Sequence, residues 1–214
     1  MGNREEVVKC VEATKVVAII RGMAPEICVK LAKAYQEGGI RLVEVTFDQV
    51  GNLAETAAAI KAIRAAFPDM HVGAGTVITE AQLDLAIGVG AEFIVTPNCN
   101  PAIIRKAKEA GLVTMPGTIT PTEMVAAHEA GADYVKVFPV RVLGPAYIKD
   151  VLAPLRHLKL IAVGGVSPEN AAGYLKAGCV GIAVSGSLVN KDWIAVGEYD
   201  KIAEVAKKLI ENCK

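Results

Sequence analysis

Residues 16–47 read VVAIIRGMAPEICVKLAKAYQEGGIRLVEVTF, and this stretch contains one complete unit of the fold. The β-branched run Val16–Ile20 predicts a short buried strand. Pro25–Glu37 opens on proline and spaces its apolar residues three and four apart, which predicts an amphipathic helix. Gly38-Gly39 ends that helix, because glycine adopts the left-handed backbone of a helix C-terminus without strain. Leu42–Phe47 predicts a second strand, and the crossover helix makes the two strands parallel.

The same order of strand and helix recurs along the rest of the chain. Six further strands are predicted at His71–Ala74, Phe93–Thr96, Val113–Met115, Tyr134–Phe138, Leu160–Val163 and Gly181–Val184. Eight strands that alternate with helices indicate the α/β class, and their number favours a (β/α)₈ TIM barrel over an open doubly wound sheet. An open sheet usually carries a dinucleotide fingerprint, and Gly73–Ile78 (GAGTVI) lacks the required small residue at its sixth position.

Two helices are predicted outside these eight units. An extra N-terminal helix precedes the first strand, with Val7, Val8 and Val11 on its apolar side, and another helix spans Ile202–Ile210. Helix starts are predicted where a capping side chain precedes proline, at Asn100-Pro101, Thr120-Pro121 and Ser167-Pro168. Because no linker or low-complexity tract divides the 214 residues, we expect a single barrel domain over residues 1–214.

Composition argues against several classes of protein. The 23 basic and 23 acidic side chains cancel, whereas a nucleic-acid-binding protein needs a basic surface to displace counterions. No apolar run approaches the roughly 18 residues of a membrane-spanning helix. The polar, acidic start MGNREE differs from a secretory signal. We therefore expect a cytoplasmic protein that binds neither nucleic acid nor membranes.

Metal and disulfide chemistry is not indicated. The five cysteines are scattered without a C-x-x-C pair, and His71, His128 and His157 have no clustered Asp, Glu or Cys at ligand spacing. Cys99 lies in a polar loop, where a small filler residue is favoured over a reactive thiol. We expect no metal and no cofactor.

Two opposite charges lie on strand faces that should point into the barrel. In Tyr134–Phe138 the two valines share one face, so if they pack under the outer helices, Lys136 points inward. In Leu42–Phe47 the two valines and the phenylalanine form the apolar face, which leaves Glu44 inside. A lysine and a carboxylate therefore converge on the barrel interior.

A structural interpretation makes these residues a buried ion pair, or makes the lysine reach out of the barrel mouth. Desolvation makes buried pairs poor stabilisers beside apolar packing, and lysine is seldom buried without a function. The functional interpretation is amine catalysis, because burial can lower a lysine pKa from about 10.4 toward 7, where about half the amine is nucleophilic. Lys136 would then form a Schiff base, and Glu44 would deliver and remove protons.

Anion-binding groups are predicted at the mouth of the barrel. Arg21, at the end of the first strand, is a candidate for holding a substrate carboxylate, although a solvated strand-end arginine is the alternative. The glycine-rich loops Val163–Pro168 and Val184–Ser187 follow the last two strands, where this fold often binds phosphate. A helix starting at Pro168 would direct its positive end toward that site. Plain glycine-rich turns are the alternative, and two such loops in the expected units favour phosphate.

The chain resembles a known enzyme family along nearly its whole length. The matching segments, in order, are Val17–Gly22 (VAIIRG), Val43–Thr46 (VEVT), Gly73–Val77 (GAGTV), Phe93–Asn98 (FIVTPN), Met115–Gly117 (MPG), Thr120–Glu123 (TPTE), Val135–Pro139 (VKVFP) and Gly164–Val166 (GGV). Each segment is short, but their order is highly specific. They resemble the class I 2-keto-3-deoxy-6-phosphogluconate (KDPG) aldolases and the overlapping 4-hydroxy-2-oxoglutarate (KHG) aldolases.

This resemblance implies a metal-independent carbon–carbon lyase of carbohydrate metabolism that acts on a small 2-keto acid. By resemblance Lys136 is the Schiff-base lysine and Glu44 the general acid/base. The other implied contacts are Thr76, Pro97 and Phe138 in the substrate pocket, and Gly164, Gly165 and Ser185 at the phosphate. Some members carry a carboxylate-binding arginine four residues after the glutamate, where this chain has Asp48, so Arg21 is expected to take over that role. Family members are commonly homotrimers, which implies a homo-oligomer.

The expected reaction is cleavage of KDPG to pyruvate and glyceraldehyde 3-phosphate, with 4-hydroxy-2-oxoglutarate, cleaved to pyruvate and glyoxylate, as a further substrate. The galactonate-series epimer of KDPG is an alternative substrate. A second alternative keeps the phosphate loops in an epimerase or synthase, which would work without Lys136. A third is a non-catalytic oligomeric scaffold, in which Lys136 would form no imine.

Overall fold

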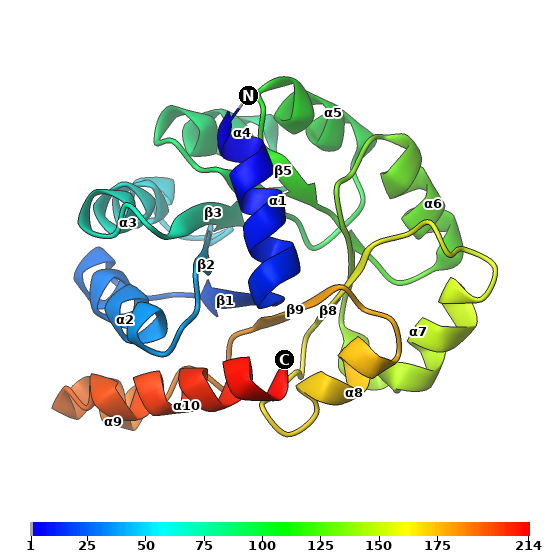
Figure 1. Cartoon of the computed structure of the whole chain (residues 1–214). Helices are drawn as coiled ribbons and strands as arrows, with labels where there is room; N and C mark the ends of the chain where they lie inside the picture. Colours follow the sequence, from blue (N-terminus) through cyan, green and yellow to red (C-terminus); the bar gives the residue numbers. More distant parts are fainter. Residues whose placement is uncertain (1) are drawn as a thin grey trace.

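The computed structural model describes residues 2–214, with side chains from residue 4 onward, and it shows a ring of parallel strands surrounded by helices (Figure 1). The strands are β1 Val16–Ile20, β2 Leu42–Thr46, β3 His71–Gly75, β4 Phe93–Val95, β5 Val113–Met115, β6 Gly117–Thr118, β7 Val135–Val137, β8 Leu160–Val163 and β9 Gly181–Val184. They are bonded in the order β5-β4-β3-β2-β1-β9-β8-β7-β6, and every pair is parallel.

The fifth predicted strand is present as β5, and a further short strand that was not predicted, β6, follows it after Pro116 and helps to close the ring. β5 pairs with β4 on one side, and β6 pairs with β7 on the other. Two hydrogen bonds join the β7 segment to this part of the ring: the N–H of Tyr134 donates to the carbonyl of Thr114 in β5, and the N–H of Lys136 donates to the carbonyl of Pro116 at 2.9 Å. Proline lacks the N–H that strand pairing uses, so it interrupts the strand without opening the ring. The (β/α)₈ prediction is confirmed.

The helices follow the strands in the predicted alternation. They are α1 Gly2–Thr14, α2 Pro25–Glu37, α3 Leu53–Ala66, α4 Glu80–Gly88, α5 Pro101–Glu109, α6 Pro121–Glu129, α7 Gly144–Leu152, α8 Ala171–Lys176, α9 Lys191–Val196 and α10 Tyr199–Asn212, with a 3₁₀ turn, η1, at Val140–Val142. Both helices predicted outside the eight units are present, as α1 and α10. In the described part of the chain, no helix has the length and apolar character needed to cross a membrane.

Two of the three predicted helix starts are confirmed. The side chains of Asn100 and Thr120 accept hydrogen bonds from the first turns of α5 and α6. The start predicted at Ser167-Pro168 is wrong, because α8 begins only at Ala171. The Ser167 hydroxyl donates to Glu169 instead of capping a helix, and the Ser167 N–H donates to the Asn170 side chain. These bonds form a turn where the sequence predicted the first helical residues.

The apolar core has two layers, one outside and one inside the ring of strands. Val135 and Val137 belong to the outer layer beneath the helices, as their alternation predicts. The inner layer fills the barrel with the opposite strand faces, and Val7 and Val11 of α1 pack against it. Figure 1 shows α1 lying across one end of the ring. The functional groups are therefore expected at the other end, where the strands finish.

Tyr35 places a hydroxyl group in the apolar outer layer. Its side chain is fully buried, and no hydrogen-bond partner for the hydroxyl lies among the described residues. An unpaired buried polar group costs about 1–3 kcal/mol. Tyr35→Phe is therefore expected to raise the free energy of unfolding by about 1 kcal/mol, measured by urea denaturation.

Tyr134→Phe is the matched control for this prediction. Tyr134 is also buried, but its hydroxyl donates to the carbonyl of Val8 at 3.4 Å. Its removal should lower stability or leave it unchanged. A Tyr35→Phe variant less stable than wild type would contradict the account of Tyr35.

Candidate active site

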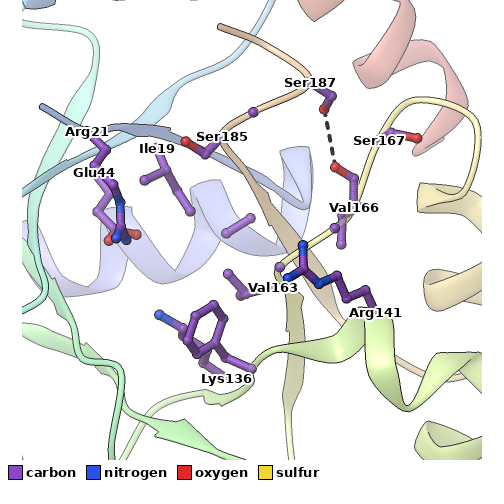
Figure 2. A pocket seen from close by; sticks show the side chains of 15 residues that line it. Ile19, Arg21, Glu44, Lys136, Arg141, Val163, Val166, Ser167, Ser185 and Ser187 are labelled. Atoms are coloured by element: carbon purple, nitrogen blue, oxygen red, sulfur yellow. Dashed lines mark hydrogen bonds between the residues drawn. The ribbon is translucent and has the colours of Figure 1, made fainter. Parts of the chain in front are cut away.

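A cavity of about 440 Å³ opens at the carboxyl ends of the strands (Figure 2). It is lined by residues of β1, β2, β7, β8 and β9 and of the segments that follow them. These residues are Ile19, Arg21, Glu44, Lys136, Phe138, Arg141, Val163, Gly164, Gly165, Val166, Ser167, Ala183, Ser185, Gly186 and Ser187. Its volume suits a small metabolite.

Lys136 on β7 and Glu44 on β2 both lie where strand alternation predicts them, on the inner faces of the ring. Lys136 is 5% exposed and Glu44 1% exposed. The Lys136 Nζ atom lies 4.7 Å from the centre of the Phe138 ring, and Figure 2 shows the amine directed into the cavity. No ion pair between described residues includes either group. The structure therefore does not show the buried Lys136–Glu44 ion pair that was the structural alternative to catalysis.

Burial shifts the pKa values of these two groups in the directions that favour the neutral form of each. It lowers the pKa of Lys136; the charge of Glu44 opposes this shift and that of Arg21 adds to it. It raises the pKa of Glu44, against the positive charges of Lys136 and Arg21. A neutral amine is a nucleophile and a protonated carboxyl is an acid, so both shifts are in the direction that amine catalysis requires.

Gly75 leaves the space that the Glu44 carboxyl occupies. A Cβ atom built on Gly75 would lie 1.9 Å from Oε1 of Glu44, while Oε2 is buried without a partner among the described residues. The carboxyl therefore has one oxygen against the β3 backbone and one available to a ligand in the cavity. Gly75 acts as a positioning residue for this carboxyl.

Gly75→Ala should move the Glu44 carboxyl by more than 1 Å. A displacement of that size can cost on the order of 100-fold in rate, so we expect kcat to fall by about that factor. Gly73→Ala is the control, because its Cβ would meet the buried Phe93 ring at 2.3 Å and should mainly lower the melting temperature. A Gly75→Ala variant with wild-type kcat would show that the position of Glu44 does not matter.

Arg21 lies where the main cavity meets a smaller one of about 290 Å³. Thr76 lines the smaller cavity, and its φ of +56° is strained for a β-branched residue. The Gln49 amide donates to the Thr76 carbonyl at 3.0 Å. Such strain gathers at functional sites. Asp48, also in this cavity, accepts a hydrogen bond from the Val50 N–H and so shapes a turn.

Of the other two residues expected in the substrate pocket, one lines the main cavity. Phe138 lies beside the Lys136 amine. Pro97 is not among the described residues that line it, and its carbonyl instead packs against Gly117, where a Cβ would approach to 2.4 Å. The structure therefore gives Pro97 a packing contact and no contact with this cavity.

The three residues expected at the phosphate all line the cavity. Gly164 and Gly165 have φ values of +93° and +86°, which favour glycine, and Ser185 lies on the neighbouring loop. Within the described chain, the N–H groups of Gly165 and Gly186 donate no hydrogen bond. These unpaired donors suit an anion. The helix-terminus contribution expected at Pro168 is absent, because α8 begins later.

Arg141 lines the cavity, and sequence reasoning missed it. It belongs to η1, which follows β7, whereas the anion-binding loops predicted from the sequence follow β8 and β9. A basic residue five positions after Lys136 was the available signal. Figure 2 shows its guanidinium on the side of the cavity away from Arg21 and Glu44.

Cys99 and the histidines lie outside this arrangement. Burial, with the charge of Glu123, raises the pKa of the Cys99 thiol, which disfavours a reactive thiolate. The His71 ring contacts Glu92 at 3.2 Å, and the rings of His128 and His157 lie 4.8 Å apart on the surface. Among the described residues, no three His, Cys, Asp or Glu side chains are grouped as a metal site would require.

Comparisons with known proteins match this chain to one family of aldolases. Residues 7–205 match the family model described as KDPG and KHG aldolase. The probable 2-dehydro-3-deoxy-6-phosphogalactonate aldolase of Rhizobium meliloti (strain 1021) is 40% identical over 80% of each chain. The KHG/KDPG aldolase of Escherichia coli (strain K12) is 32% identical over 93% of this chain and 92% of its own. A solved structure described as native KDPGal superposes with a TM-score of 0.82 at 34% identity, covering 92% and 93% of the two chains.

Proposed function

The chain belongs to the KDPG and KHG aldolase family, and from this premise we propose that it cleaves KDPG to pyruvate and glyceraldehyde 3-phosphate through a Schiff base on Lys136. The single observation that carries the proposal is the pair of buried groups, Lys136 and Glu44, in one cavity with pKa values shifted toward the neutral forms. The two side chains would supply a nucleophile and a proton donor to a substrate bound in that cavity.

The steps follow from these two side chains. The neutral Lys136 amine adds to the C2 ketone, and loss of water with a proton from Glu44 gives a protonated imine. The resulting Glu44 carboxylate accepts the C4 hydroxyl proton as the C3–C4 bond breaks, and the bonding electrons pass into the imine to form an enamine. Glyceraldehyde 3-phosphate leaves. Glu44 then gives its proton to C3 of the enamine, and water hydrolyses the protonated imine to pyruvate and the neutral lysine, with the released proton returning to Glu44.

The remaining groups are proposed to bind the ends of the substrate. Arg21, with the strained Thr76 in the adjoining cavity, suits the carboxylate, because a guanidinium presents paired donors to it. Gly164, Gly165 and Ser185 suit the phosphate. Phe138 lies between Lys136 and this end. Pro97 is proposed to shape the site only from behind Gly117.

The galactonate-series epimer is the second candidate substrate. It is favoured by the Rhizobium meliloti relative, which bears that name at 40% identity, above the 32% of the KHG/KDPG relative. Cleavage of either epimer between C3 and C4 gives the same two products, so the mechanism does not depend on this choice.

Pyruvate release from KDPG, its galactonate epimer and 4-hydroxy-2-oxoglutarate tests the proposal, with lactate dehydrogenase as the coupling enzyme. We expect one pyruvate for each phosphorylated substrate consumed, and unchanged rates after EDTA treatment, since no step uses a metal. Conversion of a substrate to its epimer, or the absence of pyruvate with all three compounds, would overturn the proposal.

The cytoplasmic location and the homotrimer remain predictions. Sedimentation of the purified protein tests the homotrimer.

A further inference from the structure

The side chains that line the main cavity include more basic than acidic groups. Arg21, Lys136 and Arg141 are basic, whereas Glu44 is the single acidic side chain among the described lining residues. Because Glu44 is held toward its neutral form, two guanidinium groups face the cavity without a carboxylate to neutralise them. A ligand with anionic groups at both ends would satisfy both.

The base of the Arg141 side chain is held against the glycine turn. Its backbone N–H donates to the Gly164 carbonyl at 3.0 Å. A Cβ built on Gly165 would lie 2.6 Å from the Arg141 Cβ and 3.0 Å from its Cδ, so the stem lies directly on the glycine. No described residue forms an ion pair with its guanidinium. The stem is therefore fixed, while the charged end is available to a ligand.

The Phe138 ring separates this charge from the reacting amine. On one side the ring centre lies 4.7 Å from the Lys136 Nζ atom. On the other side a Cβ built on Gly164 would lie 3.1 Å from the ring. A ketone bonded to Lys136 must therefore extend along the Phe138 ring to reach the turn. The anion at the turn is the end of the substrate distant from the ketone.

We propose that Arg141 binds the phosphate of the substrate together with the N–H groups of the Gly164–Gly165 turn, and thereby makes the enzyme prefer phosphorylated over unphosphorylated keto acids. This inference rests on the proposed function and extends it to a residue outside the glycine and serine loops. The planar guanidinium donates two parallel hydrogen bonds to phosphate oxygens and adds the positive charge that backbone donors lack.

The experiment compares kcat/KM for the phosphorylated substrate and its unphosphorylated counterpart. Arg141→Ala should lower the ratio of the two by about 10- to 100-fold, as expected when charge-assisted hydrogen bonds are lost. Arg141→Lys keeps the charge without the paired donors and should give an intermediate ratio. The inhibition constant of inorganic phosphate should rise at least about tenfold in Arg141→Ala, because free phosphate loses the same charged hydrogen-bond partner.

Arg156→Ala is the matched control, because Arg156 is exposed and its guanidinium donates to the backbone carbonyl of Ala153, just after α7. It removes the same charge and should keep the wild-type ratio. A ratio within twofold of wild type in Arg141→Ala, with wild-type sensitivity to phosphate, would overturn the inference. Failure of the proposed function looks different, because wild-type enzyme would then form no pyruvate adduct on Lys136.

Discussion

Lys136→Met is expected to lose at least about 10⁴-fold in kcat on any substrate of the enzyme, because removal of a covalent nucleophile leaves only substrate binding and proton transfer. Methionine fills a similar volume beside Phe138 without the amine. The barrel should therefore remain folded. Pyruvate release and thermal melting of the same preparation measure the two effects together.

The melting temperature of Lys136→Met should also depend on pH in a defined direction. In the folded protein the pKa of Lys136 lies below its unfolded value, so protonation favours the unfolded chain. The cost to wild type is absent above the unfolded pKa and reaches its full value as the pH falls through the folded pKa. The variant lacks this cost, and its advantage in melting temperature should widen toward low pH.

Lys159→Met is the matched control for both effects. Lys159 also lies over an aromatic ring, with Nζ 5.8 Å from the centre of Tyr134, but it is exposed on the outside. It should keep wild-type kcat and show no such pH trend. Pyruvate release by Lys136→Met at more than a tenth of the wild-type rate would contradict the assignment of the nucleophile.

Glu44→Gln is expected to lower kcat by about 10²- to 10⁴-fold, which is the usual contribution of a positioned acid or base. Glutamine keeps the shape of the protonated carboxyl beside Gly75 but cannot exchange its proton. Imine formation and bond cleavage both need that exchange. The loss should therefore appear in kcat more than in KM.

The stability of Glu44→Gln should follow the opposite pH trend. Burial raises the folded pKa of Glu44 above its unfolded value, so ionisation favours the unfolded chain. The wild type loses stability as the pH rises from the unfolded pKa through the folded pKa, and the variant does not. The gap in melting temperature should therefore widen toward high pH, unlike that of Lys136→Met.

Glu204→Gln on α10 is the control for Glu44→Gln, because Glu204 is exposed and distant in sequence from every lining residue. Wild-type kcat in Glu44→Gln would assign proton transfer to another group.

Strand periodicity predicted the fold and the central pair of the site. The inward placement of Lys136 and Glu44 depends only on the alternation of side chains along a strand, which a short sequence window contains. The N-terminal helix was predictable for the same reason, since its valines recur at helical spacing. The sequence therefore predicted correctly those positions that depend on the periodicity of a strand or a helix.

Features that depend on loop geometry were harder to predict. The position of Arg141 depends on the η1 turn and on its packing against Gly165, which lies 24 positions later in the chain. The positive φ of Thr76 has no sequence signal, because a β-branched residue disfavours it. At Ser167 the serine and proline fit a helix start, but side-chain bonds to Glu169 and Asn170 favour a turn.

Trapping of pyruvate on the protein is the most direct test of the central claim. Wild type, Lys136→Met and Lys159→Met are incubated with pyruvate, reduced with borohydride and digested for peptide mass spectrometry. We expect one reduced adduct, on the peptide that carries Lys136, in wild type and Lys159→Met, and none in Lys136→Met. An adduct on a different lysine, or equal labelling of all three proteins, would contradict it.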